Sequence, residues 1–313
     1  MSRIQFGVCE FSFPCWGPLA LQMAHEAGFT GMQLADAGGS TNAYPLNNKR
    51  VQESYLEAAA KYGITLQSIH LYTLVRQNFI RFSQASPEGM ECMESIKNAI
   101  IAASQMGIPV VMIEGMRMYG AAQYKHVYQM YQYAVKVAED YGVQIAMETD
   151  IRLEDHFKFL DRFDGKLKLC FDTHNPVMYG TGYPPDMIRA LGKDRIDHFH
   201  MKESLADAEG FITKETAPIV PLGKGSTFST RPSRPLRTST MRAGSSPRLS
   251  TTAATSMKTA WTTSPLPGRT WTPSKPPSAI IKYGKPGPYS NSCGLSSERA
   301  EPKTDWFCPF GDI

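Results

Sequence analysis

The sequence has few cysteines and no long apolar run. Its six cysteines, at positions 9, 15, 92, 170, 293 and 308, form no CxxC pair among 313 residues. This spacing argues against a disulfide framework or a structural zinc knuckle and favours a reducing compartment. No apolar stretch approaches the roughly 20 residues that span a bilayer, and the N-terminus shows no export pattern. We therefore expect a soluble, cytoplasmic protein without membrane contact.

Phosphate-binding motifs are also missing. Neither GxGxxG after the first apolar run nor GxxxxGK[ST] occurs anywhere in the chain. These glycine patterns let backbone N–H groups approach a pyrophosphate, so their lack argues against a dinucleotide-binding or P-loop sheet.

Acidic residues become scarce after residue 225. Residues 226–313 hold 12 Lys and Arg against 4 Asp and Glu, whereas residues 1–225 hold 21 against 25, so the net charge of +4 is −4 plus +8. The acidic balance of the first part argues against nucleic acid as a partner. The second part has 28 Ser or Thr and 12 Pro in 88 positions, a composition that rarely forms a core. We predict a folded domain over 1–225 and a disordered or out-of-frame tail over 226–313.

A displaced reading frame is one hypothesis for this tail. If each codon is shifted by two bases, residues 238–246 can encode Asp-Ile-His-Tyr-Glu-Gly-Trp-Ile-Ile and residues 259–277 an amphipathic helix. The bases contributed by Met257 and Trp261 are fixed, and both then give acidic residues. The alternative is a genuine basic extension rich in Ser, Thr and Pro.

Seven short apolar runs alternate with amphipathic stretches before the tail. The predicted strands are Ile4–Cys9, Gly31–Leu34, Thr65–Leu71, Pro109–Glu114, Val143–Thr149, Leu167–Asp172 and Ile196–Met201. The predicted helices are Pro18–Ala27, Lys49–Tyr62, Pro87–Met106, Ala121–Tyr141, Leu153–Arg162 and Pro185–Leu191. This repeat predicts an α/β fold with a parallel sheet, specifically a (β/α)₈ TIM barrel whose eighth βα unit is missing or corrupted.

Polar residues gather where the predicted strands end, at Asp36, His70, Glu114, Glu148, Asp172 and His200. In such a barrel these ends share one face, which carries the active site. Glu148, Asp172 and His200 together form a mixed oxygen and nitrogen donor set for a divalent metal. Mn²⁺, Mg²⁺, Co²⁺ and Zn²⁺ all suit such a set, and we favour Mn²⁺.

The motifs around these residues resemble a known family. They are Ala-Met-Glu148-Thr-Asp, Cys-Phe-Asp172-Thr-His-Asn, His-Phe-His200-Met-Lys-Glu and Pro-Leu-Gly-Lys-Gly225. They are similar to those of the sugar phosphate isomerases and epimerases with xylose-isomerase-like barrels, which include ketose 3-epimerases. In the ketose 3-epimerases Glu, Asp, His and a second Glu hold the metal, which implies Glu148, Asp172 and His200 here. The fourth ligand is absent from the stated sequence and would fall at Arg248 in the displaced frame.

The same resemblance bears on substrate contacts. Glu154 matches a substrate-contacting Glu of the epimerases, and Asn175 stands where they have a His. Ala206 replaces their Arg, which argues against the same free ketohexose. Spacing alone leaves His198 and His200 as alternative ligands, because both lie on one strand face, and the resemblance favours His200.

Other residues near the predicted strand ends could line a pocket. His70, followed by Arg76, could contact substrate or simply end its strand. Trp16 and Phe13 could stack on a sugar or pack in the core. We expect Lys202 to be a solvated loop lysine, although it could neutralise a phosphate or an enediolate.

This donor set suits proton abstraction next to a carbonyl, with Glu148 as the base and a metal stabilising the enediolate. The predicted function is a metal-dependent sugar isomerase or epimerase of carbohydrate metabolism. The alternatives are a lyase, resembling inosose dehydratases or the α-subunit of C-glycoside deglycosidases, or a catalytically dead truncated barrel. An endonuclease of the same superfamily is disfavoured, since the first part lacks a basic face. A homo-oligomer and a second subunit both stay open as partners.

Overall fold

The computed structural model describes residues 5–36, 44–116, 118, 120–206, 219–228 and 260–263, with the backbone alone for the last four. All of them lie within a unit that runs from Met1 to Pro267. Among the helices described, none has the length and apolar character needed to cross a bilayer.

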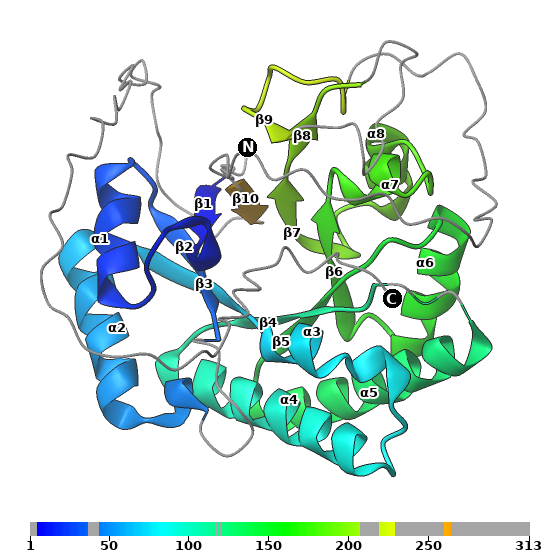
Figure 1. Ribbon diagram of the computed structural model, residues 1–313, viewed down its shortest axis with the longest axis horizontal. Helices are drawn as coiled ribbons and strands as arrows, with labels where there is room; N and C mark the ends of the chain where they lie inside the picture. Colours follow the sequence, from blue (N-terminus) through cyan, green and yellow to red (C-terminus); the bar gives the residue numbers. More distant parts are fainter. Residues whose placement is uncertain are drawn as a thin grey trace, which may run out of the picture. The chain divides into compact units, whose positions relative to one another are not determined.

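Seven parallel strands form a curled sheet (Figure 1). Each pairs with its neighbour in chain order. They are β1 (Gln5–Cys9), β2 (Gly31–Ala35), β3 (Thr65–His70), β4 (Val110–Glu114), β5 (Gln144–Glu148), β6 (Leu167–Asp172) and β7 (Ile196–Met201). The predicted seven parallel strands are therefore confirmed, with strand ends within one residue of those expected.

The eighth position of the barrel holds β10 (Ala260–Thr263), which runs antiparallel to both β1 and β7. It therefore does not continue the parallel βα repeat, and the missing or corrupted eighth unit stays a prediction. Pairing on both sides leaves neither β1 nor β7 as an open edge. Most of 226–313 lies outside the described residues, so the domain boundary at 225 and the displaced frame stay predictions.

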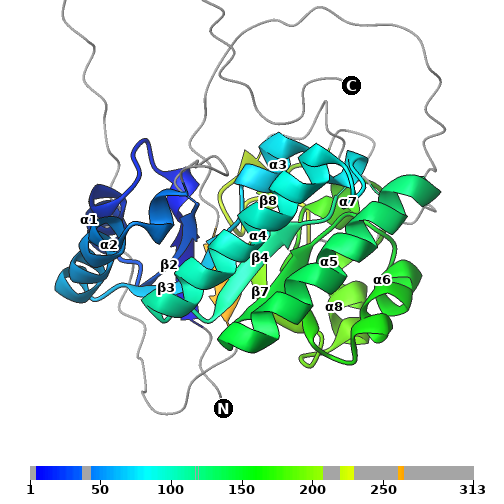
Figure 2. The same cartoon turned by 90° about the horizontal axis from the view of Figure 1, so that it is seen from below.

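Helices lie outside the sheet (Figures 1 and 2). The long ones are α1 (Pro18–Glu26), α2 (Lys49–Tyr62), α4 (Pro87–Met106), α5 (Ala121–Tyr141), α6 (Leu153–Leu160) and α8 (Pro184–Leu191). Shorter segments that the sequence did not predict are α3 (Thr73–Gln77), α7 (Asn175–Met178), the 3₁₀ turns Glu10–Ser12, Pro45–Asn47, Phe79–Arg81 and Asp161–Phe163, and a two-stranded sheet of β8 (Glu203–Ser204) and β9 (Ile219–Val220). Gly107, which ends α4 with a φ of 67°, shows why Gly punctuates the repeat: its left-handed conformation lets the chain turn into β4.

Strand alternation divides the core into two parts. Ile69, Ile113 and Met147 belong to the large apolar cluster between the sheet and the helices. A separate small cluster of Val110, Met112, Ala146 and Cys170 lies at alternate positions on the other face, inside the barrel. The barrel interior continues along the same strands into polar residues, which supply the candidate site.

A buried carboxylate joins the first strands to α2. Glu10, 0% exposed, accepts hydrogen bonds from the backbone N–H groups of Gly17 (2.7 Å) and Ala35 (2.8 Å) and from the hydroxyl of Tyr55 (2.7 Å). Burial raises the pKa of Glu10 to about 7 against the lowering effect of these donors, and the nearby Asp36 adds to the rise.

The raised pKa of Glu10 predicts a pH-dependent stability. The folded chain binds the Glu10 proton more tightly than the unfolded chain, so the free energy of unfolding should fall as pH rises from about 4.5 to 7. The full effect is up to about 3 kcal/mol. Urea unfolding across this range should show a smaller decline for Glu10→Gln, which cannot titrate. Equal slopes for both proteins would contradict the prediction.

Candidate metal and substrate site

Three of the predicted site residues meet at the carboxyl ends of their strands. Glu148 ends β5, Asp172 ends β6 and His200 lies one residue before the end of β7; all three are buried. One ligand atom from each lies within 4.8 Å of the others. The expected convergence is confirmed, whereas their role as metal ligands stays a prediction.

Hydrogen bonds fix the orientation of both carboxylates. His200 Nδ1 lies 3.0 Å from Glu148 Oε2, and the Asn175 side-chain amide donates to Glu148 Oε1 at 3.1 Å. Asp172 Oδ1 accepts from the backbone N–H groups of His174 (2.7 Å) and Asn175 (3.0 Å). Asn175, at the start of α7, therefore contacts both carboxylates, and its side chain is oriented into the site.

Lys202 is the cation of this site, and the expectation of a solvated lysine is wrong. Its ammonium lies 2.6 Å from Asp172 Oδ2, and its side chain is only 22% exposed. The reason is its position just beyond β7, where the backbone still follows the barrel wall: Lys202 N–H donates to Thr173 Oγ1. Burial alone would raise the pKa of Asp172, but Lys202 and His200 outweigh it and lower that pKa to about 2.

A second pair lies on neighbouring strands. His70 Nε2, at the end of β3, is 2.9 Å from Glu114 Oε1, at the end of β4. Phe11 and Tyr72 place their rings edge-on to the His70 ring, at centroid distances of 5.5 and 5.6 Å. His70 is thus buried and paired with a carboxylate. Contact with substrate stays a prediction for this residue.

The remaining predicted residues lie in less buried places. Trp16 is 43% exposed in the segment between β1 and α1, and Glu154 is exposed in the first turn of α6. Phe13 is partly buried against the core, which agrees with core packing, one of the two roles expected for it. The described contacts do not join Trp16 or Glu154 to the Glu148 carboxylate, so their contact with a sugar stays a prediction.

The donor chemistry of the site fits a divalent cation. Glu114, Glu148 and Asp172 bring three carboxylates, and Lys202 brings one ammonium, which leaves two formal negative charges when these four groups are ionised and the imidazoles of His70 and His200 are neutral. The Lys202 ammonium beside Asp172 already shows that this carboxylate attracts a cation. Two carboxylates and one imidazole are ligands that Mn²⁺, Mg²⁺ and Zn²⁺ accept.

Comparison with known proteins shows the family to which this barrel belongs. The model of the xylose isomerase-like TIM barrel family matches residues 21–231. The chain belongs to this family. A search of curated proteins finds no match.

Solved structures share the fold at low sequence identity. The xylose isomerase domain protein from Planctomyces limnophilus is 18% identical with a TM-score of 0.52, over 66% of this chain and 75% of that one. The probable 3-DHS dehydratase AsbF from Bacillus anthracis is 16% identical with a TM-score of 0.53, over 71% and 84%. D-psicose 3-epimerase from Clostridium cellulolyticum is 14% identical with a TM-score of 0.51, over 63% and 72%. These neighbours bear the names of isomerases, epimerases and dehydratases, and the likeness is one of fold.

Removing the Lys202 charge should destabilise the metal-free protein. Lys202→Met leaves the buried Asp172 carboxylate without its cation, at a cost of about 1–3 kcal/mol in the free energy of unfolding. Added Mn²⁺ should recover more of the melting temperature in this variant than in the parent. Lys158→Met, which breaks an exposed pair with Asp155, serves as the control and should change stability by less than about 0.5 kcal/mol. Equal losses in the two variants would contradict the role given to Lys202.

Proposed function

We propose that the barrel of this chain, once its eighth unit is complete, acts as an isomerase or epimerase that removes a proton from the carbon beside a carbonyl group of a sugar or sugar phosphate. The observation that carries the proposal is the convergence of Glu148, Asp172 and His200 at the carboxyl face of the barrel. In this fold that face carries the chemistry. Membership of the xylose isomerase-like family supports an enzyme of this type at the level of the superfamily.

Glu148, Asp172 and His200 would hold the divalent ion, and we favour Mn²⁺. When bound, such an ion supplies positive charge where the substrate oxygens become negative. Asp172, whose pKa is lowered to about 2, is a poor proton acceptor near neutral pH. This leaves Glu148 as the base in our proposal.

The neighbours of Glu148 prepare it for proton transfer. The Asn175 amide and the His200 imidazole each hold one of its oxygens, so the plane of the carboxylate is fixed before substrate arrives. A fixed carboxylate loses little conformational entropy on reaching the reactive geometry. Trp16, Glu154, His70 and Asn175 are our candidates for contacts to the sugar.

A dehydratase is the second candidate, and Lys202 favours it. Elimination uses the same proton abstraction and needs a group that stabilises the departing hydroxyl. The Lys202 ammonium, 2.6 Å from Asp172, would supply positive charge there. Burial would lower the pKa of Lys202, but Asp172 and Glu148 raise it, so Lys202 would act by its charge more than as a proton donor. Structural neighbours named as dehydratases are compatible with this reading at the level of fold.

Replacing the proposed base should abolish proton exchange. In the version restored to the other reading frame after Thr227, supplied with Mn²⁺ and a ketose in D₂O, Glu148→Gln should lower the rate of deuterium incorporation by about 10²-fold or more, because the amide cannot accept the proton. Glu139→Gln, in the surface pair with Lys166, is the matched control and should exchange at the parental rate. NMR detection of the substrate α-proton measures both.

The products distinguish the two candidates in the same experiment. An isomerase or epimerase removes the α-proton, delivers a deuteron from D₂O to the sugar and conserves the mass of the sugar apart from this label. A dehydratase releases water and forms an unsaturated product. Retention of full exchange in Glu148→Gln would rule out Glu148 as the base in either reaction.

Activity should also depend on the eighth barrel unit. We expect the 313-residue chain to be inactive or to aggregate, while a version restored to the other reading frame after Thr227 should bind Mn²⁺ and exchange a ketose α-proton. The restored version regains the fourth ligand that the resemblance implies, a second Glu, which can bind the ion or move a proton. Equal turnover by the two versions, measured by the same NMR assay, would overturn the displaced-frame hypothesis.

A further inference from the structure

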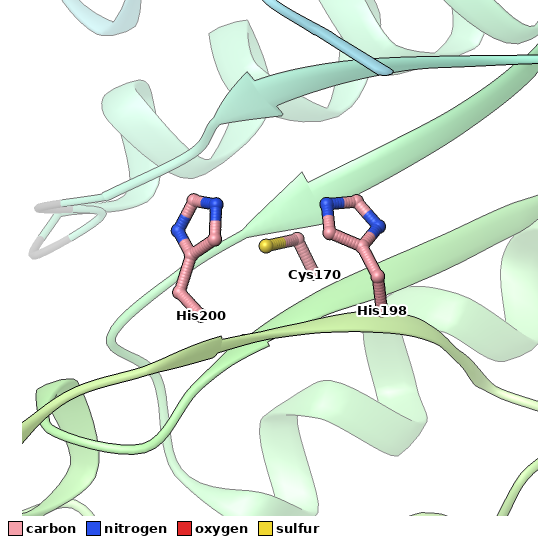
Figure 3. Close-up of side chains that lie close together, drawn as sticks. All are labelled: Cys170, His198 and His200. Atoms are coloured by element: carbon pink, nitrogen blue, oxygen red, sulfur yellow. The ribbon is translucent and has the colours of Figure 1, made fainter. Parts of the chain in front are cut away.

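A cluster of sulfur and nitrogen donors lies one layer deeper in the barrel than Asp172. Cys170, two residues before Asp172 on β6, pairs in register with His198 on β7. One ligand atom from each of Cys170, His198 and His200 lies within 4.8 Å of the others, and all three residues are at most 1% exposed. Figure 3 shows the Cys170 sulfur between the two imidazole rings.

The second observation concerns the other nitrogen of each ring. His198 Nδ1 lies 2.6 Å from Asp197 Oδ2, and His200 Nδ1 lies 3.0 Å from Glu148 Oε2. A carboxylate on one ring nitrogen is the usual partner of a metal-binding histidine, because it fixes the orientation of the ring and so directs the other nitrogen toward the ion. Both histidines of the cluster have this arrangement.

The Nε2 atoms of the two rings converge on one side chain. Gln33, on β2, places its Nε2 atom 3.3 Å from His198 Nε2 and its Oε1 atom 2.9 Å from His200 Nε2. The two Nε2 atoms therefore both face the amide group of Gln33, whose Oε1 is a further oxygen ligand atom beside them.

We propose that Cys170, His198 and His200 form a second metal site, selective for a thiophilic divalent ion such as Zn²⁺. One thiolate and two imidazoles are ligands that zinc prefers, with bonds of about 2.3 Å to sulfur and 2.0–2.1 Å to nitrogen. Tetrahedral bonds of these lengths separate the ligand atoms by about 3.5 Å, so small side-chain movements suffice. The Cys170 thiol loses its proton to the solvent as the ion binds.

This site differs in chemistry from the carboxylate site above it. The two sites share the His200 ring, whose Nδ1 faces Glu148 and whose Nε2 faces Gln33. A hard ion such as Mn²⁺ prefers the carboxylates, whereas the sulfur selects Zn²⁺ or Co²⁺. Zinc in the deeper site would therefore fix the ring that the upper site also uses.

Cobalt titration of the full chain tests the proposal. Co²⁺ bound to a thiolate gives a near-ultraviolet sulfur-to-metal charge-transfer band, and tetrahedral Co²⁺ gives intense visible bands. We expect both in the parent protein and expect Zn²⁺ to abolish them by displacement. Cys170→Ser should lose the charge-transfer band, whereas Cys92→Ser, which changes a buried cysteine of α4 outside the cluster, should keep it.

Asp172→Asn separates the two sites. It removes a carboxylate of the upper site only, so the thiolate band should persist in this variant even if sugar chemistry is lost. X-ray absorption of the zinc-loaded parent needs no variant and should show a sulfur neighbour at about 2.3 Å. A zinc environment of nitrogen and oxygen only, or a charge-transfer band that survives in Cys170→Ser, would overturn the proposal.

Discussion

The alternation of side chains along the barrel strands is the constraint on which the site depends. Every second residue of a closed sheet faces an interior without free access to water, so polar side chains there must bind one another or an ion. On β6 this places Cys170 and Asp172 in successive layers, and on β7 it does the same for His198 and His200. The upper layer is rich in oxygen and the lower in sulfur and nitrogen. A spacing of two residues along each strand thus separates the carboxylate ligands of the upper layer from the sulfur and nitrogen ligands of the lower layer.

Charge balance explains why the upper layer tolerates its carboxylates. Three buried or half-buried carboxylates without a cation would repel one another and lose their hydration, which would raise their pKa values. Lys202 contacts Asp172 directly. At Glu114, burial raises the pKa of the carboxylate, but the hydrogen bond and charge of His70 lower it more, and Lys202 lowers it further. The ammonium is thus an internal counter-ion. A divalent ion entering the site would add to this charge or displace the lysine from Asp172.

The sequence predicted most of this fold because periodicity and Gly punctuation are local properties. Helix and strand limits agree within two residues, and the convergence of Glu148, Asp172 and His200 followed from strand ends alone. Short segments such as α3 and α7 were missed because four or five residues form little more than one helical turn, which is too short for an amphipathic repeat to be recognised. The environment of Lys202 was missed for another reason: its loop position gives no periodic signal, and its ion pair depends on a residue 30 positions away.

The antiparallel strand shows that closing a barrel and completing its chemistry are separate requirements. Backbone hydrogen bonds to β1 and β7 satisfy both sheet edges, whichever direction β10 runs. The direction of β10 does decide which of its residues lies at the carboxyl face of the barrel. Ala260, the first residue of β10, pairs with Met201 at the end of β7, so the chain enters the barrel at this face instead of ending a strand there. A parallel eighth strand would deliver its last residue to this face, as β5 and β6 deliver Glu148 and Asp172. In β10 that face instead receives the first residue of the strand, Ala260.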